Sequence, residues 1–169
     1  MALKTAIVSL DGDGLRFNAS AGSGHTIVLD SGDGNMGMRP AELLPVALAG
    51  CTGMDVISIL RKKRQDVSGY RIEVGGTQMD AHPNAFTRMD VTHVVEGVGV
   101  DVDAVSRAIE LSATKYCSVG ATLASGNVEI HHGYRVIDTT TGAEVSGNVL
   151  VEGPFHDPSP VVATTAAAG

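Results

Sequence analysis

The sequence predicts an α+β fold with mainly antiparallel strand pairing. Short segments of alternating apolar and polar residues, separated by Gly- and Asp-rich turns, occupy the first 30 residues. A long apolar region and a shorter amphipathic one have helical character, and further alternating segments follow each of them. The predicted order is therefore three strands, a helix, two strands, a helix and a strand.

The N-terminal part predicts a small sheet. Residues 4–10, "KTAIVSL", and 15–20, "LRFNAS", flank the turn signal "DGDG" at 11–14, which favours a hairpin. Residues 25–30, "HTIVLD", predict a third strand, and a glycine-rich loop follows at 31–38.

A long helix is predicted next. Pro40 opens it, since proline suits the first helical turn, and it runs to about Gln65, with basic residues near its end. We expect Pro45 to kink or break it, because proline lacks the backbone donor, and Gly50 to weaken it. Apolar side chains cover nearly every side of this helix, so a second helical layer or a partner subunit must cover it.

The second half alternates strands and helices. Residues 70–79 and 88–97 predict antiparallel strands. Asp101 is a suitable N-cap for a helix over about 103–116. A short helical turn and a last strand at 127–138 follow.

One domain or two small ones fit a chain of 169 residues. We expect a single domain over 1–138. The extension at 139–169 is rich in Thr, Ala, Gly and Pro, and we expect it to be partly disordered.

Composition narrows the function. The chain is 43% hydrophobic and 18% charged, which is typical of a globular protein. Its formal charge of −7 argues against a nucleic-acid surface. The N-terminus lacks the pattern of a signal peptide, and no uninterrupted apolar run has the length of a membrane span. We therefore expect a cytoplasmic protein with no membrane partner, in a compartment where a cysteine pair is more often chemical than structural.

Motif searches leave few candidates for chemistry. His131 and His132 are adjacent on a predicted strand and so point to opposite faces, and the other histidines are scattered. The sequence has no HExxH, paired CxxC, P-loop or GxSxG motif. We expect no metal site and no cofactor.

Two cysteines remain. Cys51 follows the expected helix break, where it would face amides that lower a thiol pKa, and Cys117 ends the second helix. Two inert core cysteines are the alternative. Asp55 lies one turn after Cys51 and would raise a thiol pKa, and we expect it to bond a backbone or basic group at a dimer seam.

Two segments carry a resemblance to a known family. "RPAELLPVALAGCTGMDVISILRKKR" at 39–64 and "AIELSATKYCSVGATL" at 108–123 resemble the OsmC/Ohr family, and most closely its OsmC-like branch. The resemblance covers residues 1–138. It implies a curved antiparallel sheet with two main helices, in an intertwined homodimer with a central long helix from each chain.

The resemblance also implies an activity. Cys51 would attack an organic hydroperoxide as a thiolate and become a sulfenic acid. Cys117 would resolve this acid to a disulfide, and a dithiol reductant of unknown identity would restore the pair. The resemblance thus implies a thiol-dependent peroxidase that acts in oxidative-stress defence.

The sequence departs from the family at the activating residues. Hydroperoxide reductases of the family carry an arginine in the glycine-rich stretch that here reads "ASAGSGH" (19–25), and a glutamate ten residues before the first cysteine. Here that stretch has no arginine, and Glu42 lies nine residues before Cys51. This departure favours an alternative, a dimeric binding protein with a small-ligand pocket at its interface. The candidate replacements for the arginine are Arg39, Arg16 and Lys115.

Overall fold

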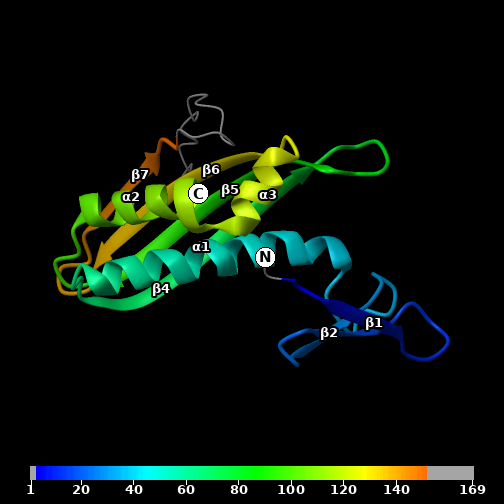
Figure 1. The fold of residues 1–169 in the computed structure, drawn as a ribbon. Coiled ribbons are helices and arrows are strands. Elements are labelled where there is room, and N and C mark those ends of the chain that lie inside the picture. Colours follow the sequence, from blue (N-terminus) through cyan, green and yellow to red (C-terminus); the bar gives the residue numbers. More distant parts are fainter. Residues whose placement is uncertain (1–2, 152–169) are drawn as a thin grey trace. The chain divides into compact units, whose positions relative to one another are not determined.

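The computed structural model describes residues 3–151, and it is an α+β fold as predicted. The chain divides into two compact units, Met1–Val46 and Ala47–Gly169, where the sequence predicted a single domain over 1–138. The physical reason is that the strands form two separate sheets, each with its own hydrogen bonds (Figure 1).

The first unit is a three-stranded antiparallel sheet followed by a short helix. Strands β1 (Ala6–Leu10), β2 (Phe17–Ala21) and β3 (Thr26–Leu29) pair in chain order, which confirms the predicted hairpin and third strand. The 3-10 helix η1 (Pro40–Glu42) follows the glycine-rich loop. Few side chains of this unit are buried, and several apolar ones are exposed, including Ile7, Val8, Leu10 and Leu15.

Helix α1 (Leu43–Lys62) is continuous, so the break expected at Pro45 is wrong. Pro45 is the third residue of the helix, and the first N–H groups of a helix have no partner within it, so a missing donor costs nothing there. Cys51 consequently lies in the helix interior, about two turns from the start. It does not face the amides of a helix start.

Burial within this chain accounts for the apolar side chains on only one face of α1. By length and composition Pro40–Lys62 is long and apolar enough to cross a membrane, but core helices of soluble proteins meet the same criteria. One face is buried and the other leaves Met54 72% exposed. The buried residues of α1 are Leu48, Thr52, Gly53, Val56 and Leu60.

The second unit has a four-stranded sheet in the order β4-β5-β6-β7. Its strands are β4 (Val67–Gln78), β5 (Phe86–Gly97), β6 (Glu129–Asp138) and β7 (Glu144–Val149). Strands β5 and β6 are parallel and the other pairs are antiparallel. The parallel pair exists because two helices lie between these strands in the chain and form the crossover.

Those helices are α2 (Val102–Leu111) and α3 (Ser118–Ser125). The Asp101 side chain accepts a hydrogen bond from the Asp103 N–H at 3.0 Å, which confirms the predicted N-cap. The predicted helix at 103–116 changes character at its end, because Ser112–Tyr116 forms a π-helical turn, η2.

The ordered sheet extends beyond the predicted boundary at residue 138. Strand β7 pairs with β6, and Val149 and Val151 are buried in the apolar core. The sequence analysis did not predict this strand, because the alternation in "EVSGNV" is weak and small residues surround it. Residues 152–169, for which we expected disorder, lie outside the described residues.

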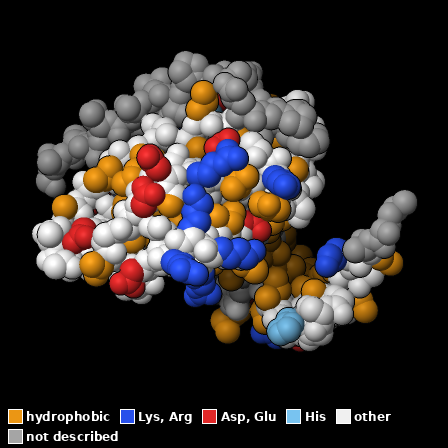
Figure 2. Space-filling view, turned by 60° about the vertical axis from the view of Figure 1, so that its left-hand side comes forward, with side chains coloured by type: hydrophobic (Ala, Val, Ile, Leu, Met, Phe, Trp, Pro, Cys, Tyr) orange, Lys and Arg blue, Asp and Glu red, His pale blue; other side chains and the backbone are white. Residues whose placement is uncertain are grey.

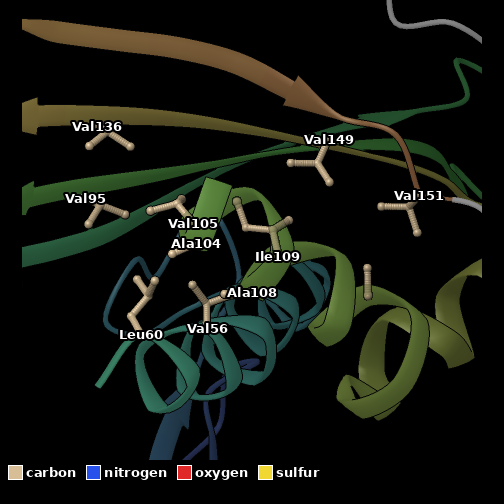
Figure 3. Close-up of a cluster of buried hydrophobic side chains, with 11 residues drawn as sticks. Val56, Leu60, Val95, Ala104, Val105, Ala108, Ile109, Val136, Val149 and Val151 are labelled. Carbon is tan, nitrogen blue, oxygen red and sulfur yellow. The ribbon is translucent and has the colours of Figure 1, made fainter. Parts of the chain in front are cut away.

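Two apolar clusters fill the second unit between its helices and its sheet. Figure 3 shows the first, in which side chains of α1 and α2 meet those of β5, β6 and β7. The second lies farther toward the start of α1. It contains Leu48, Met89, Val91, Cys117, Val128 and Ile130, with Cys51 packed against it.

Candidate active site

The two cysteines are neighbours in the second unit, and neither forms a disulfide. Cys51 comes from the middle of α1 and is half-buried. Cys117 is the N-cap of α3 and only 4% exposed. The fold therefore brings together two thiols that are 66 residues apart, since 117 − 51 = 66.

Burial dominates the electrostatics of Cys117. Together with the neighbouring Cys51 and Asp55, burial raises the pKa of this thiol to about 12. A hydrogen bond from the Gly120 N–H to Cys117 Sγ, 3.2 Å long, acts in the opposite direction. The helix start that the sequence analysis expected at Cys51 thus lies at Cys117, where burial outweighs its effect on the pKa.

A hydrogen-bonded chain of three side chains lies beside the thiols. The Ser112 hydroxyl donates to Asp55 Oδ2 at 3.0 Å. Since Ser112 has one hydroxyl proton, Thr52 must donate in the 3.0 Å bond between the two hydroxyls. Within this chain the partner of Asp55 is thus a hydroxyl, and the bond expected at a dimer seam stays a prediction.

A second polar group lies on the sheet. The Tyr70 hydroxyl and His93 Nδ1 are 2.7 Å apart, and the His93 and His132 rings stack at 6.0 Å. Burial lowers the pKa of His93 to about 4, and burial together with the Asp55 charge raises that of Tyr70. Among the described residues His93 Nε2 has no hydrogen-bond partner.

These six residues form what we call the polar layer. Along α1 and along β5, its members lie between residues of the two apolar clusters. On β5, for example, His93 stands between Val91 of the second cluster and Val95 of the first. The members of the layer are Thr52, Asp55, Tyr70, His93, Ser112 and His132.

The predicted activating residues Arg39, Glu42 and Arg16 lie in the first unit. Arg39 Nη1 donates to Glu42 Oε1 at 2.8 Å, and the Arg39 N–H donates to the other oxygen, which lowers the pKa of Glu42. Arg16 pairs with Asp11 at 3.0 Å. The third candidate, Lys115, belongs to the second unit, and its ammonium lies 5.5 Å from the centre of the Tyr116 ring.

The described residues include no group of three or more His, Cys, Asp or Glu side chains suited to a metal ion. His132 is buried on β6, while its neighbour His131 is half-buried and on the opposite face of the strand.

A shallow apolar groove of about 390 Å³ runs beside the exposed face of α1. Helix α1 contributes small and apolar side chains to it and β4 contributes the rest. The lining residues are Ala49, Gly50, Gly53, Met54, Ile57, Tyr70, Arg71 and Ile72.

The sequence analysis missed most of the polar layer. Thr52 and Ser112 lie within the two segments that carry the family resemblance. Ser112 also interrupts the apolar face of the helix predicted over 103–116. A buried hydroxyl requires a partner, so this interruption was a usable signal. His93 and Tyr70 gave none, because their proximity depends on strand register.

Comparisons with known proteins agree with this fold. The family model described as OsmC-like protein matches residues 32–132. Protein YhfA of Escherichia coli K12 is 38% identical over 125 residues, which cover 74% of this chain and 92% of that protein. The crystal structure of a hypothetical protein from Aquifex aeolicus VF5 is 30% identical in sequence and has a TM-score of 0.70. The match covers 82% of this chain and 98% of that protein's chain.

A more distant structure carries a functional description. The organic hydroperoxide resistance protein OsmC from Legionella pneumophila matches with a TM-score of 0.56 and 11% sequence identity. The match covers 80% of this chain and 97% of that protein's chain. At that identity the likeness shows a shared fold.

Proposed function

The chain belongs to the OsmC-like protein family, and from this premise we propose that it is a thiol-dependent peroxidase that reduces organic hydroperoxides. The observation that carries the proposal is the proximity of Cys51 and Cys117 on two different helices. The half-buried Cys51 is open to a substrate, while Cys117 is covered.

The proposed reaction has three steps. The Cys51 thiolate attacks one oxygen of the hydroperoxide, which breaks the O–O bond and gives a sulfenic acid and an alcohol. Cys117 then forms the disulfide with Cys51, and the hydroxyl leaves as water. A dithiol reductant breaks this disulfide by exchange and is itself oxidised. We place this cycle in the cytoplasm, where such reductants keep thiols reduced.

Thiol counting tests the proposal. Reduced protein is mixed with cumene hydroperoxide, and free thiols are counted over time. We expect both thiols of each chain to disappear and one molecule of alcohol to form per disulfide. Cys117→Ser should accumulate a sulfenic acid that dimedone traps, and Cys51→Ser should lose no thiol rapidly. Wild-type protein that keeps both thiols would contradict the peroxidase.

The cation that activates Cys51 is part of the same proposal. We assign this role to Arg39, with Arg16 as the second candidate. Arg39 already holds a carboxylate, that of Glu42, through two hydrogen bonds. Such arginine–carboxylate pairs have fixed geometry and suit the orientation of a polar substrate.

A homodimer is the proposed assembly. The uncovered face of α1 exposes Leu44, Val46 and Met54, and the strands of the first unit expose further apolar residues. Hydrophobic side chains reach the surface in several places on the face in Figure 2. Exposed apolar surface supports this assembly, because it often marks interaction sites.

The groove beside α1 favours one alternative function. Its apolar lining suits a small apolar or electrophilic ligand, so the protein is in that case a dimeric binding protein. The thiol count separates the two functions, because a binding protein keeps its thiols in the presence of cumene hydroperoxide.

A further inference from the structure

Ser112 connects the two cysteine segments through two different bonds. Its hydroxyl donates to Asp55 Oδ2 on α1 at 3.0 Å. Its carbonyl accepts from the Cys117 N–H at 2.8 Å. Asp55 is one turn after Cys51 on the same helix, so Ser112 joins the helix that carries one thiol to the backbone that carries the other.

From this geometry we propose that Asp55 and Ser112 are positioning residues that hold Cys117 in place to attack the sulfur of Cys51. The proposal deepens the proposed function, on which its setting rests, and it concerns the closing of the disulfide. In that step the S–S bond forms and the S–O bond of the sulfenic acid breaks. The thiol proton of Cys117 leaves with the hydroxyl as water.

The surroundings make this connection effective. Ser112 is fully buried, as is Thr52, which donates to the Ser112 hydroxyl. Because Ser112 and Thr52 are shielded from solvent, water does not compete with the Asp55 carboxylate for the Ser112 proton, so the bond persists. A reaction between two fixed groups depends steeply on their alignment, so small losses of order slow it.

Asp55 has a second effect of opposite sign. Its charge raises the pKa of Cys117, and so lowers the fraction of reactive thiolate at neutral pH. The other titratable group that acts on Cys117 is Cys51, and Tyr70 faces Asp55 from β4. The Ser112–Asp55 hydrogen bond therefore favours closing of the disulfide, while the charge of Asp55 opposes it. Substitutions at these residues separate the two effects.

Ellman's reagent measures closing without any peroxide. The reagent forms a mixed disulfide at Cys51, the more accessible thiol. The Cys117 thiolate then attacks Cys51, and the thionitrobenzoate leaves with the electron pair of the broken bond as a coloured product. The rate of this second release is the closing rate, and Cys117→Ser, which releases only the first equivalent, is the control.

Four variants separate the bond from the charge. Ser112→Ala keeps the charge and loses the bond, so we expect closing about tenfold slower than in the wild type. Asp55→Asn keeps an acceptor oxygen and loses the charge, so it should close faster than the wild type at the same pH. Asp55→Ala loses both and should close about tenfold more slowly than Asp55→Asn. Thr122→Val removes an exposed hydroxyl that donates to the Ser118 carbonyl on α3, outside this connection, and should close within about twofold of the wild type.

Two results would overturn the proposal: Ser112→Ala closing at the wild-type rate, or Asp55→Asn and Asp55→Ala closing at the same rate. Thermal unfolding of each reduced variant shows whether it is folded, and Asp55, which is half-buried, gives a variant pair even if Ser112→Ala does not fold. Because these rates need no peroxide, they stand apart from the cumene hydroperoxide test. Failure in that test would remove the peroxidase and leave the positioning result intact.

Discussion

At the scale of single residues, the Arg39–Glu42 pair of the first unit can be tested directly. We expect Arg39→Ala to slow alkylation of Cys51 by iodoacetamide at pH 6 about tenfold, because a nearby cation favours the reactive thiolate. Peroxide consumption should slow in parallel. Arg107→Ala is the matched control, because Arg107 and Glu110 form an exposed pair with the same spacing.

The second candidate is tested alongside. If Arg16→Ala slows alkylation and Arg39→Ala does not, the activating role passes to Arg16. If neither variant nor Lys115→Ala changes the reactivity of Cys51, no predicted cation activates this thiol, and the binding-protein function is then favoured.

The buried histidine predicts a pH dependence of stability. The pKa of His93 is about 4 in the folded protein and 6.5 as a model value, so the unfolded chain takes up the proton first as pH falls. Above pH 6.5 the ring is neutral in both states and costs the folded protein nothing. As pH falls from 6.5 toward 4, the free energy of unfolding decreases by about 3 kcal/mol.

Urea unfolding at pH 7 and pH 4.5 measures this loss. His93→Gln should unfold with a much smaller difference between the two pH values, whereas His25→Gln, a change at an exposed residue, should behave as the wild type. Asp138, whose pKa several hydrogen bonds lower to about 2, titrates below this window. An unchanged pH dependence in His93→Gln would contradict the assignment.

At the scale of elements, the start of α2 is explained by local capping. Asp101 caps α2 through the N–H of Asp103. We expect Asp101→Ala to lower the free energy of unfolding by about 1 kcal/mol, because that donor loses its partner. Asp101→Asn retains the capping oxygen and should cost much less. Thermal or urea unfolding of the two variants gives the comparison, and equal losses would show that the cap contributes little.

At the scale of the whole molecule, the uncovered face of α1 predicts a dimer. Sedimentation of the purified protein should give a dimer at micromolar concentration. Met54→Lys places a charge on the exposed apolar face and should shift the protein to monomers, while Val98→Lys, at an exposed apolar residue in a turn, should not. A folded wild-type monomer at all concentrations would contradict the proposed assembly.

The sequence alone determined the α+β class and the order of the main strands and helices as far as residue 138. Alternation and turn residues predicted the hairpin, Asp101 marked a helix start, and the two cysteine segments indicated the family. These features are local, so a few adjacent residues carry them. The same local reasoning failed at Pro45, where the effect of a proline depends on its distance from the helix start.

The tertiary structure alone decided how distant residues combine. The division into two units, the β7 strand beyond residue 138 and the polar layer all depend on strand register and helix packing. Asp55 and Ser112 are 57 residues apart, and no periodicity in the sequence joins them. Their bond exists because burial removes water and leaves each polar group with its nearest partner, which the fold as a whole determines.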